Sequence, residues 1–130
     1  MSKKIVIIGG DPNSINSEII NKAWKKINSK TKKQTYLIGN YNLICKQYRK
    51  LGFKESLIKV ENIEDNIIST SLKILDIPLN FKNPFKVNFN ESTKYVLKSL
   101  NLGHKLAKNG KIKGIINCPI DKSLIKISNK

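Results

Sequence analysis

Short apolar segments rich in β-branched residues alternate with amphipathic segments along this chain, and that alternation constrains the fold more than any other feature. The first apolar segment, Ile5–Ile8, contains no polar residue, as is typical of a strand buried on both faces. Strands are predicted at residues 5–8, 35–39, 56–60 and 112–117. Strands that alternate with helices predict an α/β fold, a mainly parallel sheet with helices on both faces.

Three of the intervening segments have helical periodicity. The first predicted helix covers residues 17–29, and its apolar face comprises Ile19, Ile20, Ala23, Trp24 and Ile27. The second begins near Asn42 and ends at Gly52, which is suited to a carboxyl cap. The third runs from Glu91 to Lys108, with an apolar face of Val96, Leu100, Gly103 and Ala107, and ends at Asn109-Gly110.

Two further segments complete the predicted order of elements. Residues 61–91 contain Pro78 and Pro84, and proline is confined to strand edges and turns. We therefore predict that residues 61–91 form a peripheral excursion outside the sheet. Pro119 turns the chain after the last strand, and a new helix is predicted to begin in residues 121–127.

Composition limits the classes of protein to which the chain can belong. It has 130 residues, about one domain, and 39% of them are hydrophobic, enough for a core. The formal net charge is +16, but 24 of the 25 basic residues are lysine and only Arg49 is arginine, the residue that reads bases. The lysines are scattered, as an AT-rich genome would impose on surface positions. Nucleic-acid binding is therefore not the favoured function.

The sequence also bears on the compartment. No apolar run approaches the roughly 20 residues of a membrane span, and the first apolar run is too short for a secretory signal. Cys45 and Cys118 are far apart and form no metal-binding pattern, which predicts two reduced, buried thiols. These features predict a cytoplasmic protein.

Two segments follow predicted strands at the edge of the sheet where α/β proteins bind ligands. The first, Gly9–Asn16, fits neither the dinucleotide fingerprint nor the P-loop pattern. It is either a tight turn, in which Asp11 could cap the following helix, or part of a binding cleft. The second segment covers residues 117–122, and its Lys122 is either solvated or placed to attract a phosphate or carboxylate. The candidate cleft residues are Asp11, Asn117, Asp121 and Lys122.

Together the two segments resemble a known family. Residues 10–18 read GDPNSINSE, and residues 117–125 read NCPIDKSLI. Their order, separation and predicted structure are similar to two motifs in the amino-terminal part of the 4-hydroxythreonine-4-phosphate dehydrogenase family, G-[DE]-P-x-G-I-G-P-E and [ST]-[AG]-P-[IV]-x-K-x-x-[IL]. This chain differs in having Ser14, Asn16 and Ser17 where the family has Gly, Gly and Pro.

The resemblance implies a fold like that of isocitrate and isopropylmalate dehydrogenases. It implies an enzyme of pyridoxine and pyridoxal phosphate synthesis that oxidises a small phosphorylated substrate, 4-phosphohydroxythreonine, with NAD or NADP. It also implies a divalent metal held by three histidines, and a homodimer. On this resemblance residues 1–130 correspond to the amino-terminal part of the family's domain, without the carboxyl-terminal part.

The same resemblance implies that the chain as given lacks the chemistry of the whole enzyme. The family's metal-binding histidines and its Gly-His-Thr-Glu segment come after the second motif. The single histidine here, His104, matches no family ligand, and we expect it to lie on the surface or to pack within its helix. We therefore expect the 130 residues to be inactive alone and to bind neither cofactor nor metal tightly, with no catalytic residue among them.

Two other classes of function remain open from the sequence. One is a small phosphate- or nucleotide-binding α/β module that is complete at 130 residues, which would need a sheet with no unpaired apolar edge. The other is a basic protein associated with nucleic acid, which would need its lysines gathered on one face.

Overall fold

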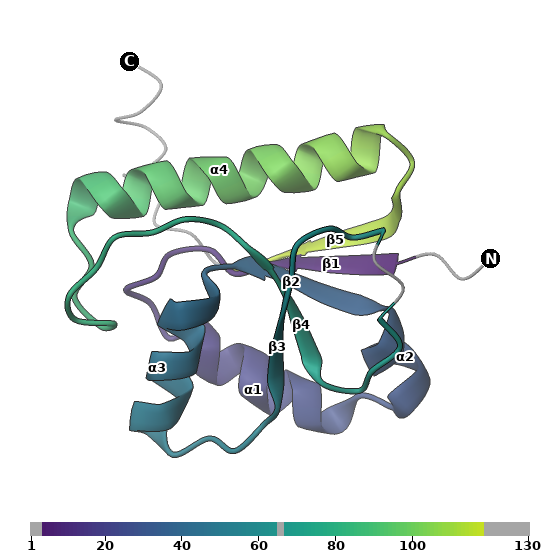
Figure 1. Cartoon of the computed structure of the whole chain (residues 1–130), viewed down its shortest axis with the longest axis horizontal. Coiled ribbons are helices and arrows are strands. Elements are labelled where there is room, and N and C mark those ends of the chain that lie inside the picture. Colours follow the sequence, from purple (N-terminus) through teal and green to yellow (C-terminus); the bar gives the residue numbers. More distant parts are fainter. Residues whose placement is uncertain (1–3, 65–66, 119–130) are drawn as a thin grey trace.

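A computed structural model describes residues 4–64 and 67–118, in which five strands and four helices are present (Figure 1). In chain order they are β1 (Lys4–Ile8), α1 (Asn16–Lys26), α2 (Ser29–Gln34), β2 (Thr35–Gly39), α3 (Tyr41–Leu51), β3 (Leu57–Val60), β4 (Leu72–Asp76), α4 (Phe89–Lys108) and β5 (Ile112–Asn117). None of these helices is long and apolar enough to cross a membrane.

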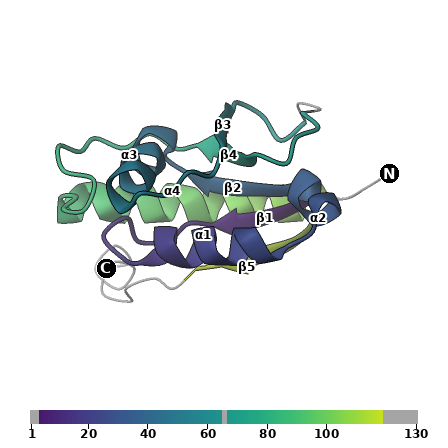
Figure 2. The same ribbon diagram turned by 90° about the horizontal axis from the view of Figure 1, so that it is seen from below.

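The strands form one sheet in the order β3-β4-β2-β1-β5, and every neighbouring pair is parallel. Figures 1 and 2 show α4 on one face of the sheet and α1 and α3 on the other. Since parallel neighbours need crossover connections, these helices are the connections that return the chain to the start of the next strand. The predicted α/β class is confirmed.

Each face of the sheet has its own core. Val6, Ile8 and Ile38 belong to the core on the α4 side, whereas Leu37 and Ile74 pack with Trp24 of α1 on the other side. The strands therefore bury side chains on both faces, which explains the unbroken apolar sequence of residues 5–8 in β1. The close approach of α4 to β1 requires a glycine at position 103, because a Cβ there would lie 2.7 Å from Cδ1 of Ile8.

The predicted strands at 5–8, 35–39, 56–60 and 112–117 are confirmed within a residue at their ends. Gly52 has φ of 75° and caps α3, as predicted. The predicted helix over 17–29 is wrong in its extent, because the chain turns at Ile27 and begins α2 at Ser29. Two apolar-face assignments are also wrong, since Ile19 and Ala107 are exposed. The helix predicted in residues 121–127 lies outside the described residues.

The largest correction concerns residues 61–91, which were predicted to lie outside the sheet. They contain β4, which pairs with β3 on one side and β2 on the other and so lies inside the sheet. Pro78 and Pro84 follow the strand, in the connection to α4, and remove no hydrogen bond from it. Lys73 also interrupts the apolar pattern of β4, because its charged side chain lies in an otherwise buried strand.

Lys73 is buried, with no exposed surface, and forms hydrogen bonds only to backbone carbonyl groups in the described part of the chain. Its ammonium group donates to the carbonyl oxygens of Lys32 at 3.2 Å, Lys33 at 3.1 Å and Ser69 at 3.1 Å. Burial and, to a smaller extent, the nearby charge of Lys4 together lower the pKa of Lys73 to about 8. The site tolerates the cation by surrounding it with dipoles.

This depressed pKa predicts a pH dependence of stability. The unfolded chain binds a proton at Lys73 up to a pH of about 10.4, whereas the folded chain releases it above about 8. The free energy of unfolding should therefore rise between these pH values, because the unfolded state binds more protons there. Urea unfolding of the wild type and of Lys73→Met across this range would measure the effect as a difference. The same pH dependence in both proteins would contradict the assignment.

Strand β5 lies at an edge of the sheet in the described part of the chain, although its sequence predicted a buried strand. It pairs with β1 on one side, and Ile116 is 55% exposed. Ile116 and Ile19 border an apolar groove of about 200 Å³, which Trp24 and Cys118 also line. A parallel edge strand with an apolar flank offers unpaired backbone groups to other chains.

We therefore expect the isolated chain to self-associate as salt concentration increases. The net charge of +16 keeps copies apart at low ionic strength, and the Debye length falls to about 8 Å at physiological ionic strength. Light scattering across a sodium chloride series would follow the association. Ile116→Lys should abolish it, whereas Ile68→Lys, at another exposed isoleucine, should not. A monomer at every salt concentration would contradict the expectation and favour a complete small module.

Candidate functional site

The carboxyl ends of all five strands meet at one edge of the sheet, because all the strands are parallel. The loop after β1 (residues 9–15), the start of α3 after β2, and residues 77–88 after β4 are gathered there (Figure 1). In α/β sheets this is the edge at which ligands bind. It is the candidate site.

The two sequence motifs begin side by side at this edge. Ile8 of β1 is in register with Asn117 of β5, and the backbone N–H of Cys118 donates to the carbonyl oxygen of Ile8 at 3.1 Å. Asn117 is exposed, and Asp11 is half-buried in the neighbouring loop. Asp121 and Lys122 lie outside the described residues, so their placement stays a prediction.

Asp11 organises its own loop and does not cap α1. Its Oδ1 accepts a hydrogen bond from the backbone N–H of Asn13 at 2.9 Å. Gly10, with φ of 75°, makes the sharp turn before it. Helix α1 begins at Asn16, so its cap position is Ile15, which provides no side-chain cap. The prediction that Asp11 could cap this helix is wrong, because Asp11 lies too far before the first turn.

Asn13 ties the first loop to the segment that leads into α4. Its Nδ2 donates to the carbonyl oxygen of Val87 at 2.9 Å, and its Oδ1 accepts from the backbone N–H of Val87 at 2.7 Å. A side-chain amide that pairs with a backbone amide in both directions fixes the distance between the two segments. The loops after β1 and β4 are therefore held together.

Gln47 of α3 is a second clamp, buried beneath the same loops. Its Nε2 donates to the carbonyl oxygens of Pro12 at 2.9 Å and Pro84 at 2.8 Å, and its Oε1 accepts a hydrogen bond from the hydroxyl of Ser17. The cavity between the first loop, α1 and α3 measures about 20 Å³, room for one water molecule. The first loop therefore encloses no space for a nucleotide.

Replacing this clamp tests how much it contributes to stability. Gln47→Leu keeps the volume but leaves two buried carbonyl groups and the Ser17 hydroxyl without their partner. We expect a loss of about 2–3 kcal/mol in the free energy of unfolding, measured by urea denaturation. Gln34→Leu, at a partly exposed glutamine of α2, is the matched control and should change stability by less than about 0.5 kcal/mol. Equal effects of the two substitutions would show that Gln47 is no clamp.

The strand order identifies a second part of the site that the sequence did not indicate. The connections after β1 and β2 run through helices on one face, whereas the connection after β4 runs through α4 on the other (Figure 1). The connections that follow the neighbouring strands β2 and β4 therefore lead to opposite faces of the sheet, although the strands stay paired up to Gly39 and Asp76. Crevices for ligands form at such switch points.

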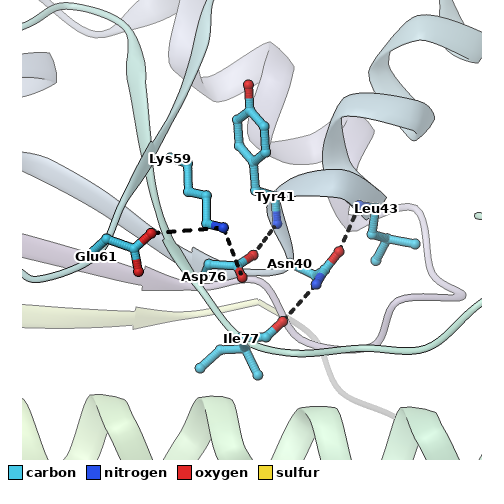
Figure 3. A network of polar contacts seen from close by, with 7 residues as sticks. All are labelled: Asn40, Tyr41, Leu43, Lys59, Glu61, Asp76 and Ile77. Carbon is cyan, nitrogen blue, oxygen red and sulfur yellow. Dashed lines mark hydrogen bonds and ion pairs between the residues drawn. The ribbon is translucent and has the colours of Figure 1, made fainter.

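Asn40 occupies this switch point and joins its two sides (Figure 3). Its Oδ1 caps α3 by accepting from the backbone N–H of Leu43 at 2.9 Å, and its Nδ2 donates to the carbonyl oxygen of Ile77 at 2.8 Å. The backbone N–H of Asn40 donates to the hydroxyl of Tyr95 at 2.8 Å. Burial raises the pKa of Tyr95 well above its usual value, so the hydroxyl stays protonated.

Asp76, at the end of β4, brings a carboxylate to this switch point (Figure 3). Its Oδ1 accepts from the backbone N–H of Tyr41 at 2.8 Å, in the first turn of α3, where a negative charge is favourable. Its Oδ2 lies 3.9 Å from Nζ of Lys59, which is also 3.8 Å from Oε1 of Glu61. The hydrogen bond from Tyr41 to Asp76 fixes the start of α3. Of these three charged groups, Lys59 and Glu61 are the exposed ones that a ligand could reach.

No group of three or more His, Cys, Asp or Glu side chains among the described residues lies close enough to hold a metal ion. His104 is exposed on α4, in agreement with its expected surface position, and lines a shallow hollow with Asn117. Cys118 is buried and Cys45 half-buried, and both are free thiols.

These features define a doubly wound α/β sheet with a closed, amide-clamped carboxyl edge. The structure is similar to that of a 4-hydroxythreonine-4-phosphate dehydrogenase from Burkholderia phymatum, with a TM-score of 0.83 and 17% identity over 98% of this chain and 39% of that chain. It is also similar to a 4-hydroxythreonine-4-phosphate dehydrogenase from Klebsiella pneumoniae, with a TM-score of 0.79 and 20% identity over 98% of this chain and 40% of that chain.

A terephthalate 1,2-cis-dihydrodiol dehydrogenase from Burkholderia xenovorans also shares the fold, with a TM-score of 0.66 and 20% identity over 100% of this chain and 38% of that chain. No protein-family model matches the sequence, and no curated protein matches it significantly. The chain spans about two fifths of the length of the solved structures that it matches. The fold is thus that of part of these dehydrogenases, as the motifs predicted.

Proposed function

We propose that this chain forms the amino-terminal part of a dehydrogenase that oxidises 4-phosphohydroxythreonine with NAD or NADP, in pyridoxine and pyridoxal phosphate synthesis. The observation that carries the proposal is the register of β1 with β5, which brings the beginnings of both family motifs to one edge. The similarity to two solved dehydrogenases of this name supports it. The TM-score of 0.66 to a dihydrodiol dehydrogenase supports the reaction type, a dehydrogenation, and does not favour one substrate over another.

In this proposal the chain supplies one wall of the substrate cleft. Asp11 and Asn117 line the wall at the ends of β1 and β5, and Asp121 and Lys122 extend it. The ammonium group of Lys122 attracts the phosphate or carboxylate of the substrate, since lysine is a compact point charge for anions. The divalent metal, the dinucleotide and the second protomer of the dimer would be bound by residues of the family's longer chain.

The decisive experiment is to read the nucleotide sequence after the codon of Lys130 for an in-frame Gly-His-Thr-Glu segment, and to assay both lengths of protein. We expect the 130-residue chain to form no NADH from 4-phosphohydroxythreonine with any divalent metal, and the extended protein to do so. Metal-dependent NADH formation by the 130-residue chain would contradict the proposal. A stop codon directly after Lys130 would remove its basis.

Within an active extended protein, one substitution tests the role assigned to Lys122. Lys122→Gln should raise KM for the phosphorylated substrate by about tenfold or more, because a charge-assisted hydrogen bond is lost. Lys113→Gln, at an exposed lysine near the start of β5, is the control and should leave KM within about twofold. Equal effects would remove Lys122 from the cleft while leaving the reaction itself in place.

A further inference from the structure

A second hollow lies at the opposite edge of the sheet, where the strands begin. It has a volume of about 580 Å³, within the range of small-molecule sites. Lys4, at the start of β1, and Tyr36, near the start of β2, form its floor. Its remaining walls come from α2 and from the connection between β3 and β4, namely Lys30, Lys33, Gln34, Ile67 and Ile68.

Positive charge is concentrated around this floor. Nζ of Lys4 lies 5.3 Å from the centroid of the Tyr36 ring, and Nζ of Lys73 lies 4.9 Å from the same centroid. Two ammonium groups therefore share one aromatic ring, and the charge of Lys4 contributes to the lowered pKa of Lys73. Lys30 and Lys33 are exposed at the mouth of the hollow.

No carboxylate among the described residues forms an ion pair with this cluster. The described ion pairs belong to Lys59 and Lys111, and Glu64, whose pKa the charge of Lys4 helps to lower, is paired with Lys111. The carbonyl groups at the end of α2, which would repel an anion, accept hydrogen bonds from Lys73. The hollow is thus lined by three lysines, and the buried charge of Lys73 lies close to the Tyr36 ring.

We propose that this hollow binds an oligophosphate group of two or three phosphoryl units, either free or carried by a nucleotide. Lys30 and Lys33 contact the phosphoryl oxygens, as does Lys4 through the N–H groups that it does not donate to the carbonyl oxygen of Ile63. Lys73 adds its charge without contact, since its three N–H groups are already used. A hollow of about 580 Å³ has room for a group of this size. The proposal is independent of the dehydrogenase function, which concerns the other edge of the sheet.

Isothermal titration calorimetry of the 130-residue chain at 150 mM sodium chloride tests this inference. Tripolyphosphate, ATP and orthophosphate are the probes. We expect one molecule of tripolyphosphate or of ATP to bind per chain, and orthophosphate to bind at least about tenfold more weakly, because fewer charges are engaged. Binding of tripolyphosphate without ATP would support the site and identify a free oligophosphate as the ligand. Binding of ATP without tripolyphosphate would overturn the proposal.

Paired variants separate a built site from attraction to a highly charged chain. Lys30→Gln combined with Lys33→Gln should weaken tripolyphosphate binding by about tenfold, and both residues are exposed, so the fold is retained. Lys94→Gln combined with Lys98→Gln removes the same charge from exposed positions of α4 and should weaken binding by less than about twofold. Equal losses in the two pairs, or more than one molecule bound per chain, would overturn the proposal.

Discussion

The parallel pairing of β1 with β2 and of β2 with β4 is the interaction on which the rest of the structure depends. Parallel neighbours cannot be joined by a tight turn, so each connection must cross a face of the sheet. The helices in these connections cover both faces and bury strands such as Ile5–Ile8 between two cores. The same pairing gathers the carboxyl ends of the strands at one edge and the amino ends at the other, which gives the molecule two chemically different edges.

The carboxyl edge is held together mainly by neutral amides. Asn13, Asn40 and Gln47 each connect segments that are far apart in the sequence, through hydrogen bonds of 2.7–2.9 Å to backbone groups. Such bonds fix the geometry of the loops without placing a charge between them. They leave room for one water molecule beneath the first loop.

The sequence predicted those parts of the fold that depend on local pattern. Strands β1, β2, β3 and β5 consist mostly of apolar residues, although Lys59 and Lys113 interrupt two of them, and the glycine at position 52 ends α3 by its own conformational freedom. Strand β4 was missed because Pro78 and Pro84 follow it closely and because Lys73 interrupts its apolar pattern. Lys73 is tolerated only through carbonyl groups from α2 and Ser69 that pattern alone cannot place. Tertiary contacts outweighed the local signal here.

The candidate site was predictable only where it followed a strand directly. The loop after β1 and Asn117 at the end of β5 were found because each comes after an apolar run, and their adjacency follows from the pairing of these strands. Asn40 and Asp76 were not found, since their importance depends on β4 lying beside β2, an order that skips β3 along the chain. A polar residue directly after a glycine that ends a strand, as Asn40 follows Gly39, is the one local signal that pointed to this position.

The charge balance of the chain gives the amino edge its character. There are 25 basic residues against nine acidic ones, so most lysines have no carboxylate with which to pair. An unpaired lysine on the surface costs little free energy, because water and salt screen exposed charges. A buried lysine needs dipoles instead, and Lys73 obtains them from the end of α2 and from Ser69. That solution neutralises the end of the helix and leaves Lys4, Lys30 and Lys33 facing a hollow, with no ion pair to any of them among the described residues. Elsewhere on the surface the excess of lysine reflects the composition of the chain. At this edge the fold places three of these lysines around one hollow.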